Sequence, residues 1–221
     1  MISINQLAEF QKATEKGKVR IIKQQKTPNK IKVSYYQLAK GRIKKSLANG
    51  GASQYIKDAL DELSKRKPLE SRKKVDRQVS IEALNRFLLL QLPRILKLSG
   101  ITFLNKSDYK SSTDINGVDI VVAPDLIFTT IVNGREVVGG LKLHVSKSKA
   151  FDMQQQQIIA SGIYQYLEKE VANGKLSVDP DWCISLDIFG NGFVRIEAAE
   201  TDLVYRDKNI YTEIKRIWDA A

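Results

Sequence analysis

Hydrophobic residues recur every three or four positions in several parts of the chain, which is the spacing of an amphipathic helix. The clearest case is residues 52–68, where the periodicity ends at Pro68. Another follows Ser80, a residue type that favours helix N-termini, and reaches Pro93, which kinks or ends a helix. The same periodicity predicts helices over residues 3–16, 35–51, 149–174 and 209–221.

Runs of β-branched and apolar residues predict strands after Gly100. Asn133-Gly134 separates two of these runs, 125–132 and 136–145, and such a dipeptide predicts a hairpin with a two-residue turn. A further strand is predicted for residues 117–123, and a second hairpin for residues 181–198. From residue 80 onward the order of elements is α-β-β-β-α-β-β-α, which is typical of the α/β fold class.

The chain is predicted to divide near residue 78. Residues 69–78 are polar and highly charged, which favours a linker between residues 1–78 and residues 79–221. The first region is expected to be mainly helical, with one hairpin over residues 18–36 that places lysines on its open side. The second region holds the predicted α/β core.

Charge is unevenly distributed over the 221 residues, whose net charge is +11. Residues 1–97 hold 23 Lys and Arg against 8 Asp and Glu, whereas residues 98–221 hold 13 against 17. A basic half favours a polyanionic partner, here DNA or RNA, although a solvated basic surface gives the same pattern. The basic residues expected to contact nucleic acid, some with neighbouring tyrosines suited to base stacking, are Lys40, Arg42, Lys44, Lys45, Lys147 and Lys149.

Several functional classes lack their sequence signatures. Cys183 is the single cysteine, so neither an intramolecular disulfide framework nor a cysteine-based zinc site is expected. There is no glycine-rich phosphate loop after a strand and no nucleophile elbow. The first residues do not resemble a signal peptide, and no apolar run is long enough to cross a bilayer, so a cytoplasmic protein without a membrane partner is expected.

The first predicted hairpin carries an acid and a base. Folding back at Asn133-Gly134 places Asp125 opposite Lys142, about 5 Å apart at Cβ if the strands pair without a bulge. A carboxylate can hold Mg²⁺ or Mn²⁺, and a neighbouring lysine can orient a water molecule or offset phosphate charge. The pair therefore suggests phosphodiester chemistry.

This stretch resembles the PD-(D/E)XK nuclease superfamily, also called restriction-endonuclease-like. The resemblance covers about half of the chain and includes Pro124-Asp125, the hairpin, the sequence Gly140-Leu141-Lys142 and a following helix. It implies an α-β-β-β-α-β core in which Asp125 binds the metal ion and Lys142 acts in catalysis. Gly140 stands where the family has its second acid, and this departure should weaken metal binding.

Another acid would then have to complete the metal site. Glu82, near the start of the helix before the sheet, is the preferred candidate for both the metal site and catalysis, because some family members carry an acid there. Asp119 and Asp152 are alternatives, whereas Glu136 is about 13 Å from Gly140 along the strand and too far away. For each of these acids, a solvated surface carboxylate is the alternative interpretation.

Three other residues near the motif invite a functional interpretation. Some exonuclease-like family members carry a Gln and a Tyr on the helix after the motif, which suggests Gln157 and Tyr164 as nucleic-acid contacts, two helical turns apart. A polar helix face with a half-buried tyrosine is the alternative. His144 shares a strand face with Lys142 and is interpreted as a structural histidine rather than a general base.

Two functions follow from these residues. The first is a metal-dependent nuclease that cleaves DNA or RNA with Asp125, Lys142 and a recruited acid. The second is an inactive nuclease-fold protein that binds nucleic acid or serves as an assembly subunit, as a homo-oligomer or with a partner protein. Gly140 favours the second, and the retained Asp125 and Lys142 favour the first.

Overall fold

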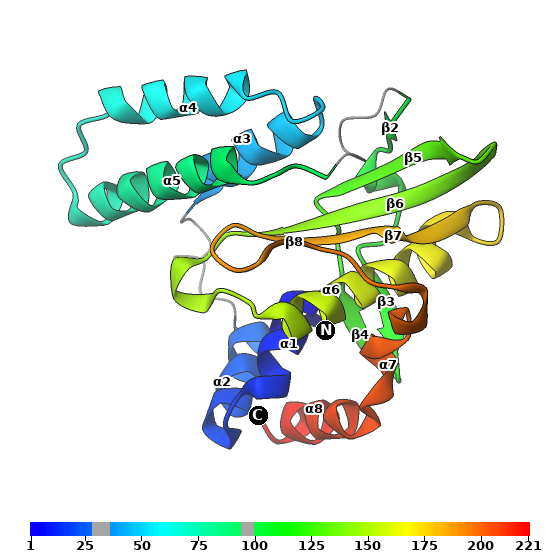
Figure 1. Ribbon diagram of the computed structural model, residues 1–221. Helices are drawn as coiled ribbons and strands as arrows, with labels where there is room; N and C mark the ends of the chain where they lie inside the picture. Colours follow the sequence, from blue (N-terminus) through cyan, green and yellow to red (C-terminus); the bar gives the residue numbers. More distant parts are fainter. Residues whose placement is uncertain (28–35, 94–99) are drawn as a thin grey trace.

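A five-stranded sheet runs through the molecule, with helices on both faces (Figure 1). The computed structural model describes residues 1–27, 36–93 and 100–221. In sheet order the strands are β2 (Thr102–Phe103), β5 (Leu126–Val132), β6 (Arg135–His144), β7 (Ser177–Asp187) and β8 (Gly192–Val194). Strands β6 and β7 are parallel and are joined through α6 (Met153–Tyr166), whereas the other neighbours are antiparallel. The predicted α/β class is confirmed.

The predicted hairpin is β5–β6. Asn133 and Gly134 both have positive φ angles, 50° and 76°, as a tight hairpin turn with matching twist requires. Helices cover both faces of these strands, so residues 127–130 of β5 and 137–141 of β6 are buried on either side. The turn and the pairing together set the register in which the motif residues meet.

A smaller three-stranded sheet lies beside the main one. Its order is β1 (Ile2–Ser3), β4 (Val118–Val121) and β3 (Ser112–Ile115). The strand expected at residues 117–123 is therefore present, but its neighbours are β1 and β3 rather than the motif hairpin. In the main sheet, β2 takes the place beside β5, paired through Thr102 and Phe103.

On one side of the main sheet, α6 contacts β6 and β7. Helices from both ends of the chain, α1 (Ile4–Lys12), α2 (Glu15–Lys26) and α8 (Lys208–Ala220), share one apolar core with α6, β1 and β4. Helices α1 and α6 approach closely at Gly162, where a Cβ atom would lie 2.6 Å from Ile4 Cδ1. A π-helical turn, η5 (Leu167–Ala172), continues α6, and the short helix α7 (Leu203–Arg206) packs against α6.

The opposite face is covered by three helices, α3 (Gln37–Leu47), α4 (Gln54–Lys65) and α5 (Ser71–Leu89) (Figure 1). Their apolar sides form a second core with sheet residues such as Phe128, Leu141 and Trp182. The basic N-terminal region is consequently divided between the two faces, with α1 and α2 on one face and α3 to α5 on the other.

Three expectations about the N-terminal half need correction. Residues 18–26 are helical in α2, where Ile21 and Ile22 face inward; the rest of the expected hairpin, residues 28–35, lies outside the described residues. The expected linker, residues 69–78, lies mostly in α5, because its Arg, Lys and Gln are good helix formers. Ser80 is thus a buried interior residue of α5, and the boundary expected between residues 78 and 79 falls inside this helix.

The predicted ends of α5 and α6 near Pro93, Asp152 and Gly174 lie close to the observed ones. Helix α5 stops at Leu89, shortly before Pro93, and residues 94–99 lie outside the described residues. Helix α6 begins at a capping box of Asp152 and Gln155, and its π-helical extension ends before Asn173 and Gly174, both with positive φ. Within the described ranges, no helix combines the length and apolar character needed to cross a membrane.

Candidate functional site

Asp125 and Lys142 lie opposite each other at the end of the β5–β6 ladder. Leu126 pairs with Leu141, so the predicted hairpin register is confirmed over β5, and its continuation places Asp125 beside Lys142. The backbone of Asp125 donates to Leu141 O at 2.7 Å, and its carboxylate Oδ2 accepts from the Leu143 amide at 2.8 Å. The Asp125 side chain thus takes the place of a backbone acceptor where strand pairing ends.

The ammonium of Lys142 is held in a half-buried position. Its Nζ donates to the carbonyl oxygen of Ala123 at 2.7 Å, in the turn that precedes Asp125. Burial lowers the pKa of Lys142 from 10.5 to about 8, and the nearby Asp125 carboxylate opposes this decrease. The positive charges of Lys40, Lys106 and Lys44 lower this pKa further.

Two lysines of α3 reach the same place. Lys44 Nζ lies 3.5 Å from Asp125 Oδ1, and Lys40, one turn earlier, is half-buried within electrostatic range of Asp125. Burial lowers the pKa of Lys40, and Asp125 partly offsets the effect. The Lys40 ammonium donates no hydrogen bond to any residue in the described part of the chain. We call Asp125 with Lys40, Lys44 and Lys142 the lysine site.

The acids proposed for a metal site have other partners or belong to other elements. Glu82 accepts from Lys147 Nζ at 2.8 Å and lies 3.5 Å from Arg86, and the bond to Lys147 is the main reason why its pKa is lowered. Asp152 caps α6 and pairs with Lys12, and Asp119 belongs to the smaller sheet.

Metal fit can be judged from the side chains around Asp125. Over residues 1–27, 36–93 and 100–221, no group of three or more His, Cys, Asp or Glu side chains is placed to hold a metal ion. The charged neighbours of Asp125 are lysines, and divalent cations need oxygen ligands with negative charge. The described residues therefore do not fit Mg²⁺ or Mn²⁺ at this position.

Gly140 occupies a position that α6 has closed. A Cβ atom at Gly140 would lie 3.0 Å from Ile163 Cγ2 and 3.3 Å from Leu167 Cδ1. Both side chains are fully buried in the core between the sheet and α6. The position that carries the second acid in the nuclease superfamily therefore faces apolar packing in this protein.

Most of the other basic residues predicted to bind nucleic acid already interact with side chains of the protein itself. Arg42 pairs with Glu62 at 3.0 Å, and Lys45 Nζ lies 4.9 Å from the ring centroid of Tyr55. Lys147 pairs with Glu82 and Lys149 with Glu9. Among the residues predicted to bind nucleic acid, only Lys40 and Lys44 have a described interaction with Asp125.

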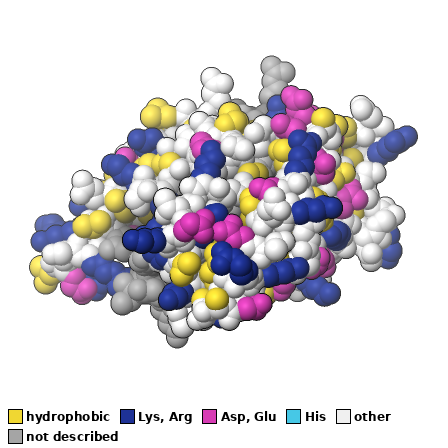
Figure 2. Space-filling model, turned by 90° about the horizontal axis from the view of Figure 1, so that it is seen from below, with side chains coloured by type: hydrophobic (Ala, Val, Ile, Leu, Met, Phe, Trp, Pro, Cys, Tyr) yellow, Lys and Arg dark blue, Asp and Glu magenta, His cyan; other side chains and the backbone are white. Residues whose placement is uncertain are grey.

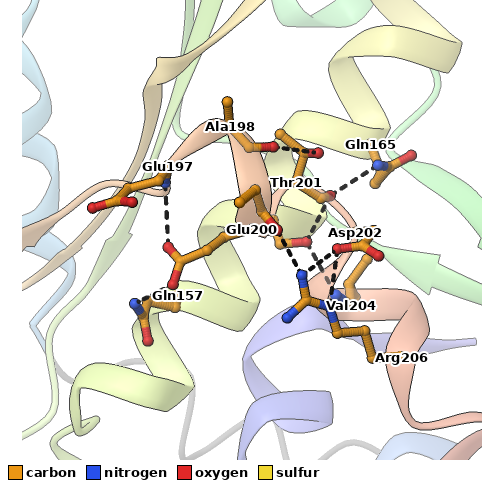
Figure 3. A network of polar contacts seen from close by, with 11 residues as sticks. Gln157, Gln165, Glu197, Ala198, Glu200, Thr201, Asp202, Val204 and Arg206 are labelled. Atoms are coloured by element: carbon orange, nitrogen blue, oxygen red, sulfur yellow. Dashed lines mark hydrogen bonds and ion pairs between the residues drawn. The ribbon is translucent and has the colours of Figure 1, made fainter.

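Gln157 and Tyr164 point to other parts of the molecule. Gln157 Nε2 donates to Glu200 Oε1 at 3.0 Å, within a polar network that ties α6 to residues 197–206 (Figure 3). Tyr164 is half-buried, and burial together with Glu168 raises its pKa. Nucleic-acid contacts by these two residues stay a prediction from the sequence, and none of their described contacts includes Asp125 or Lys142.

His144 uses both ring nitrogens inside the protein. Nε2 lies 2.8 Å from the carbonyl oxygen of Lys149, and Nδ1 lies 3.3 Å from the Asn5 amide nitrogen. Its ring stacks on Phe151 with centroids 4.1 Å apart, and burial lowers its pKa. This environment agrees with a structural role and links the end of β6 to α1.

One contributor to the lysine site was missed by the sequence reasoning. Lys106, in the short turn η3 (Lys106–Asp108) after β2, lowers the pKa of Lys142 through its charge. No local pattern distinguishes this lysine from other surface lysines, since only the pairing of β2 with β5 brings it near.

We expect the free energy of unfolding to depend on Lys142 in alkaline solution. The folded-state pKa of Lys142, about 8, is below its ordinary value of 10.5, so between these pH values the unfolded chain binds the extra proton. Stability should therefore rise by about 1 to 2 kcal/mol over this window. Urea unfolding from pH 7 to 10 measures it, and Lys142→Met should lack this part of the rise. An equal rise in the free energy of unfolding of Lys142→Met would contradict the lowered pKa of Lys142.

Comparison with models of known protein families gives no match, and comparison with curated protein sequences gives none.

Proposed function

We propose that this protein binds nucleic acid through phosphate contacts at the lysine site and does not depend on a metal ion to do so. The observation that carries the proposal is the convergence of three ammonium groups on one carboxylate, from α3 on one side and β6 on the other. The local excess of positive charge, half-buried and therefore poorly screened, favours an anion such as a phosphodiester.

Lys40 is the residue best suited to receive a phosphate oxygen. Its ammonium is partly desolvated, which lowers its pKa, and it has no hydrogen-bond acceptor among the residues that the structure describes. A phosphate beside it would supply both an acceptor and a compensating charge. Lys44 could turn from Asp125 to the same phosphate, because its Nζ lies 3.5 Å from Asp125 Oδ1, which is longer than an ordinary N–H···O hydrogen bond.

The arrangement of elements supports a restriction-endonuclease-like core. Counting only the main sheet, the order is α5, β2, β5, β6, α6 and β7, which is the α-β-β-β-α-β order of the PD-(D/E)XK nucleases. On this proposal the protein keeps the scaffold of that superfamily and uses the motif strands to bind phosphate.

Metal-dependent hydrolysis is the second candidate function. The observation in its favour is the register of Asp125 with Lys142, which share one end of the hairpin as the motif requires. Against it are the lysine neighbours of Asp125 and the ion pairs that occupy Glu82. Hydrolysis therefore stays a prediction, and the experiment below also measures cleavage.

Binding of labelled single-stranded and duplex DNA and RNA, followed by fluorescence anisotropy, tests the proposal. We expect Lys40→Gln/Lys44→Gln to weaken binding about tenfold at low salt, because two phosphate contacts are lost. The control is Lys175→Gln/Lys208→Gln, which removes the same charge from two exposed lysines without described ion pairs.

The same samples with and without Mg²⁺ or Mn²⁺ are analysed for cleavage. Binding that is unaffected by chelator, with intact nucleic acid, supports the proposal. Equal affinity of the Lys40/Lys44 variant and its control would reject the lysine site. Cleavage that requires the metal ion and disappears in Lys142→Ala would instead establish the nuclease.

A further inference from the structure

Helix α2 carries a second row of cations on its exposed side. Lys16, Arg20 and Lys23 are four and three residues apart, so their side chains share one face of the helix. All three are exposed, and none of their side chains forms an ion pair or hydrogen bond with another residue of the described chain. These three positive charges are therefore available to a partner.

The rest of α2 is fixed to the protein. Ile21 and Ile22 are buried in the core, and Lys18 pairs with Glu213 of α8 at 2.8 Å. Lys26 donates to the carbonyl oxygen of Trp218, also in α8. The helix is thus held by its apolar side and by two of its cations, while the other three point outward.

A path of neighbouring residues leads from the lysine site to this row. His144 lies two residues beyond Lys142 on β6, and its Nε2 is 2.8 Å from the carbonyl oxygen of Lys149. Lys149 lines a groove of about 220 Å³ together with Lys12 and Arg20, the central residue of the row. In Figure 1 the segment after β6 passes between α3 to α5 above and α2 below.

Acidic residues interrupt this path but do not cover the row itself. Lys149 pairs with Glu9, and Lys12 pairs with Asp152. Figure 2 views the molecule from below, the side on which α2 and α8 lie in Figure 1, and shows dark-blue Lys and Arg side chains among magenta acidic ones. A polyanion following the path would meet strong positive potential at α3 and α2, with weaker potential between them.

We infer that the row Lys16, Arg20 and Lys23 is a second phosphate-binding surface, and that the partner is a nucleic-acid strand long enough to reach from the lysine site to α2. This inference rests on the proposed function and adds the size of the ligand. A mononucleotide or a very short oligonucleotide would occupy the lysine site alone, whereas a longer strand would also contact α2.

The chemistry of α2 favours nucleic acid over a membrane surface. A helix that lies on a membrane buries an apolar face among the lipids. The isoleucines of α2 face the protein core, and Val19, 37% exposed, is the one large apolar side chain that it exposes in the described structure. Attraction by charge without an apolar face is what phosphate contacts provide.

The test compares two labelled single-stranded oligonucleotides, of about 4 and about 20 nucleotides, binding to the whole chain. The variant is Lys16→Gln/Arg20→Gln/Lys23→Gln, and the matched control is Arg135→Gln/Lys175→Gln/Lys208→Gln. The control also removes one arginine and two lysines, all exposed and without a described ion pair. Because both sets are on the surface, both variants are expected to fold with unchanged thermal stability.

We expect the α2 variant to bind the long oligonucleotide about tenfold more weakly than the control at low salt, with the salt slope reduced by about 2. Its affinity for the short oligonucleotide should equal that of the control. Equal affinity of the two variants for the long oligonucleotide would overturn this inference. The inference would also be overturned if the α2 variant lost binding to phosphatidylserine vesicles while its nucleic-acid binding stayed unchanged.

The Lys40→Gln/Lys44→Gln variant separates this inference from the proposed function. If it loses affinity for both oligonucleotides while the α2 variant behaves like its control, the lysine site stands and the α2 surface does not. If the wild-type chain binds neither oligonucleotide at low salt, the proposed function fails, and the inference fails with it.

Discussion

Gly140→Asp, the substitution that restores the second acid of the nuclease motif, is expected to destabilise the protein severely. The new Cβ atom would lie 3.0 Å from Ile163 Cγ2 and 3.3 Å from Leu167 Cδ1, so the carboxylate would enter an apolar layer. Overpacking and a buried charge without a partner should together cost about 3 to 5 kcal/mol. Chemical denaturation followed by circular dichroism measures this loss directly.

Two further substitutions at Gly140 separate size from charge. Gly140→Ala adds the Cβ atom alone and should cost about 1 to 3 kcal/mol, as for other overpacked core positions. Gly140→Asn has nearly the shape of aspartate without its charge, so it should lie between the other two. A Gly140→Asp protein with wild-type stability would show that α6 yields at this position. If that protein also bound Mg²⁺ in calorimetry, the position would be open to a metal ligand.

Asp125→Asn is expected to strengthen nucleic-acid binding, the opposite of its effect on a metal-dependent nuclease. Asp125 is the one carboxylate that the described contacts place beside Lys40, Lys44 and Lys142, so its neutralisation raises the local positive charge. Asparagine can still accept the hydrogen bond from the Leu143 amide through its carbonyl oxygen. We expect affinity for an oligonucleotide to rise about three- to tenfold at low salt, measured by anisotropy.

The pH of this measurement matters, because the Asp125 carboxylate raises the pKa of Lys142. Without it the pKa of Lys142 is lowered further, so the comparison belongs on the acid side of neutrality, where more of the ammonium keeps its proton. Asp125→Ala is the structural control, since it removes both the charge and the acceptor for Leu143. Weaker binding by Asp125→Asn, at unchanged stability, would contradict the lysine site and favour a metal bound at Asp125.

These two results would together decide how the motif is used. A nuclease site needs Asp125 for metal binding and gains from an acid at position 140. The proposed phosphate-binding site would gain from the loss of the Asp125 charge, and an acid at position 140 is expected to destabilise the fold, because it would lie among Ile163 and Leu167. The expected outcomes have opposite signs at Asp125, so a single pair of variants separates the two functions.

Local patterns in the sequence determined the hairpin and its register. Asn133-Gly134 requires a tight turn, and a tight turn defines which residues of β5 and β6 lie opposite each other. The position of Asp125 beside Lys142 followed from that arithmetic alone. The start of α6 at Asp152 and its end near Gly174 were also marked by residues with local capping or turn preferences.

Long-range packing decided which faces of the helices and the sheet contact each other. No local signal could show that α3 packs over the motif strands and brings Lys40 and Lys44 to Asp125, because residues 40 and 125 meet only through the shared core. Nor could it show that Ile163 and Leu167 fill the space at Gly140. Charge and periodicity determined that this chain has a basic half and an α/β fold, whereas the cations available to a partner depend on ion pairs formed between distant elements.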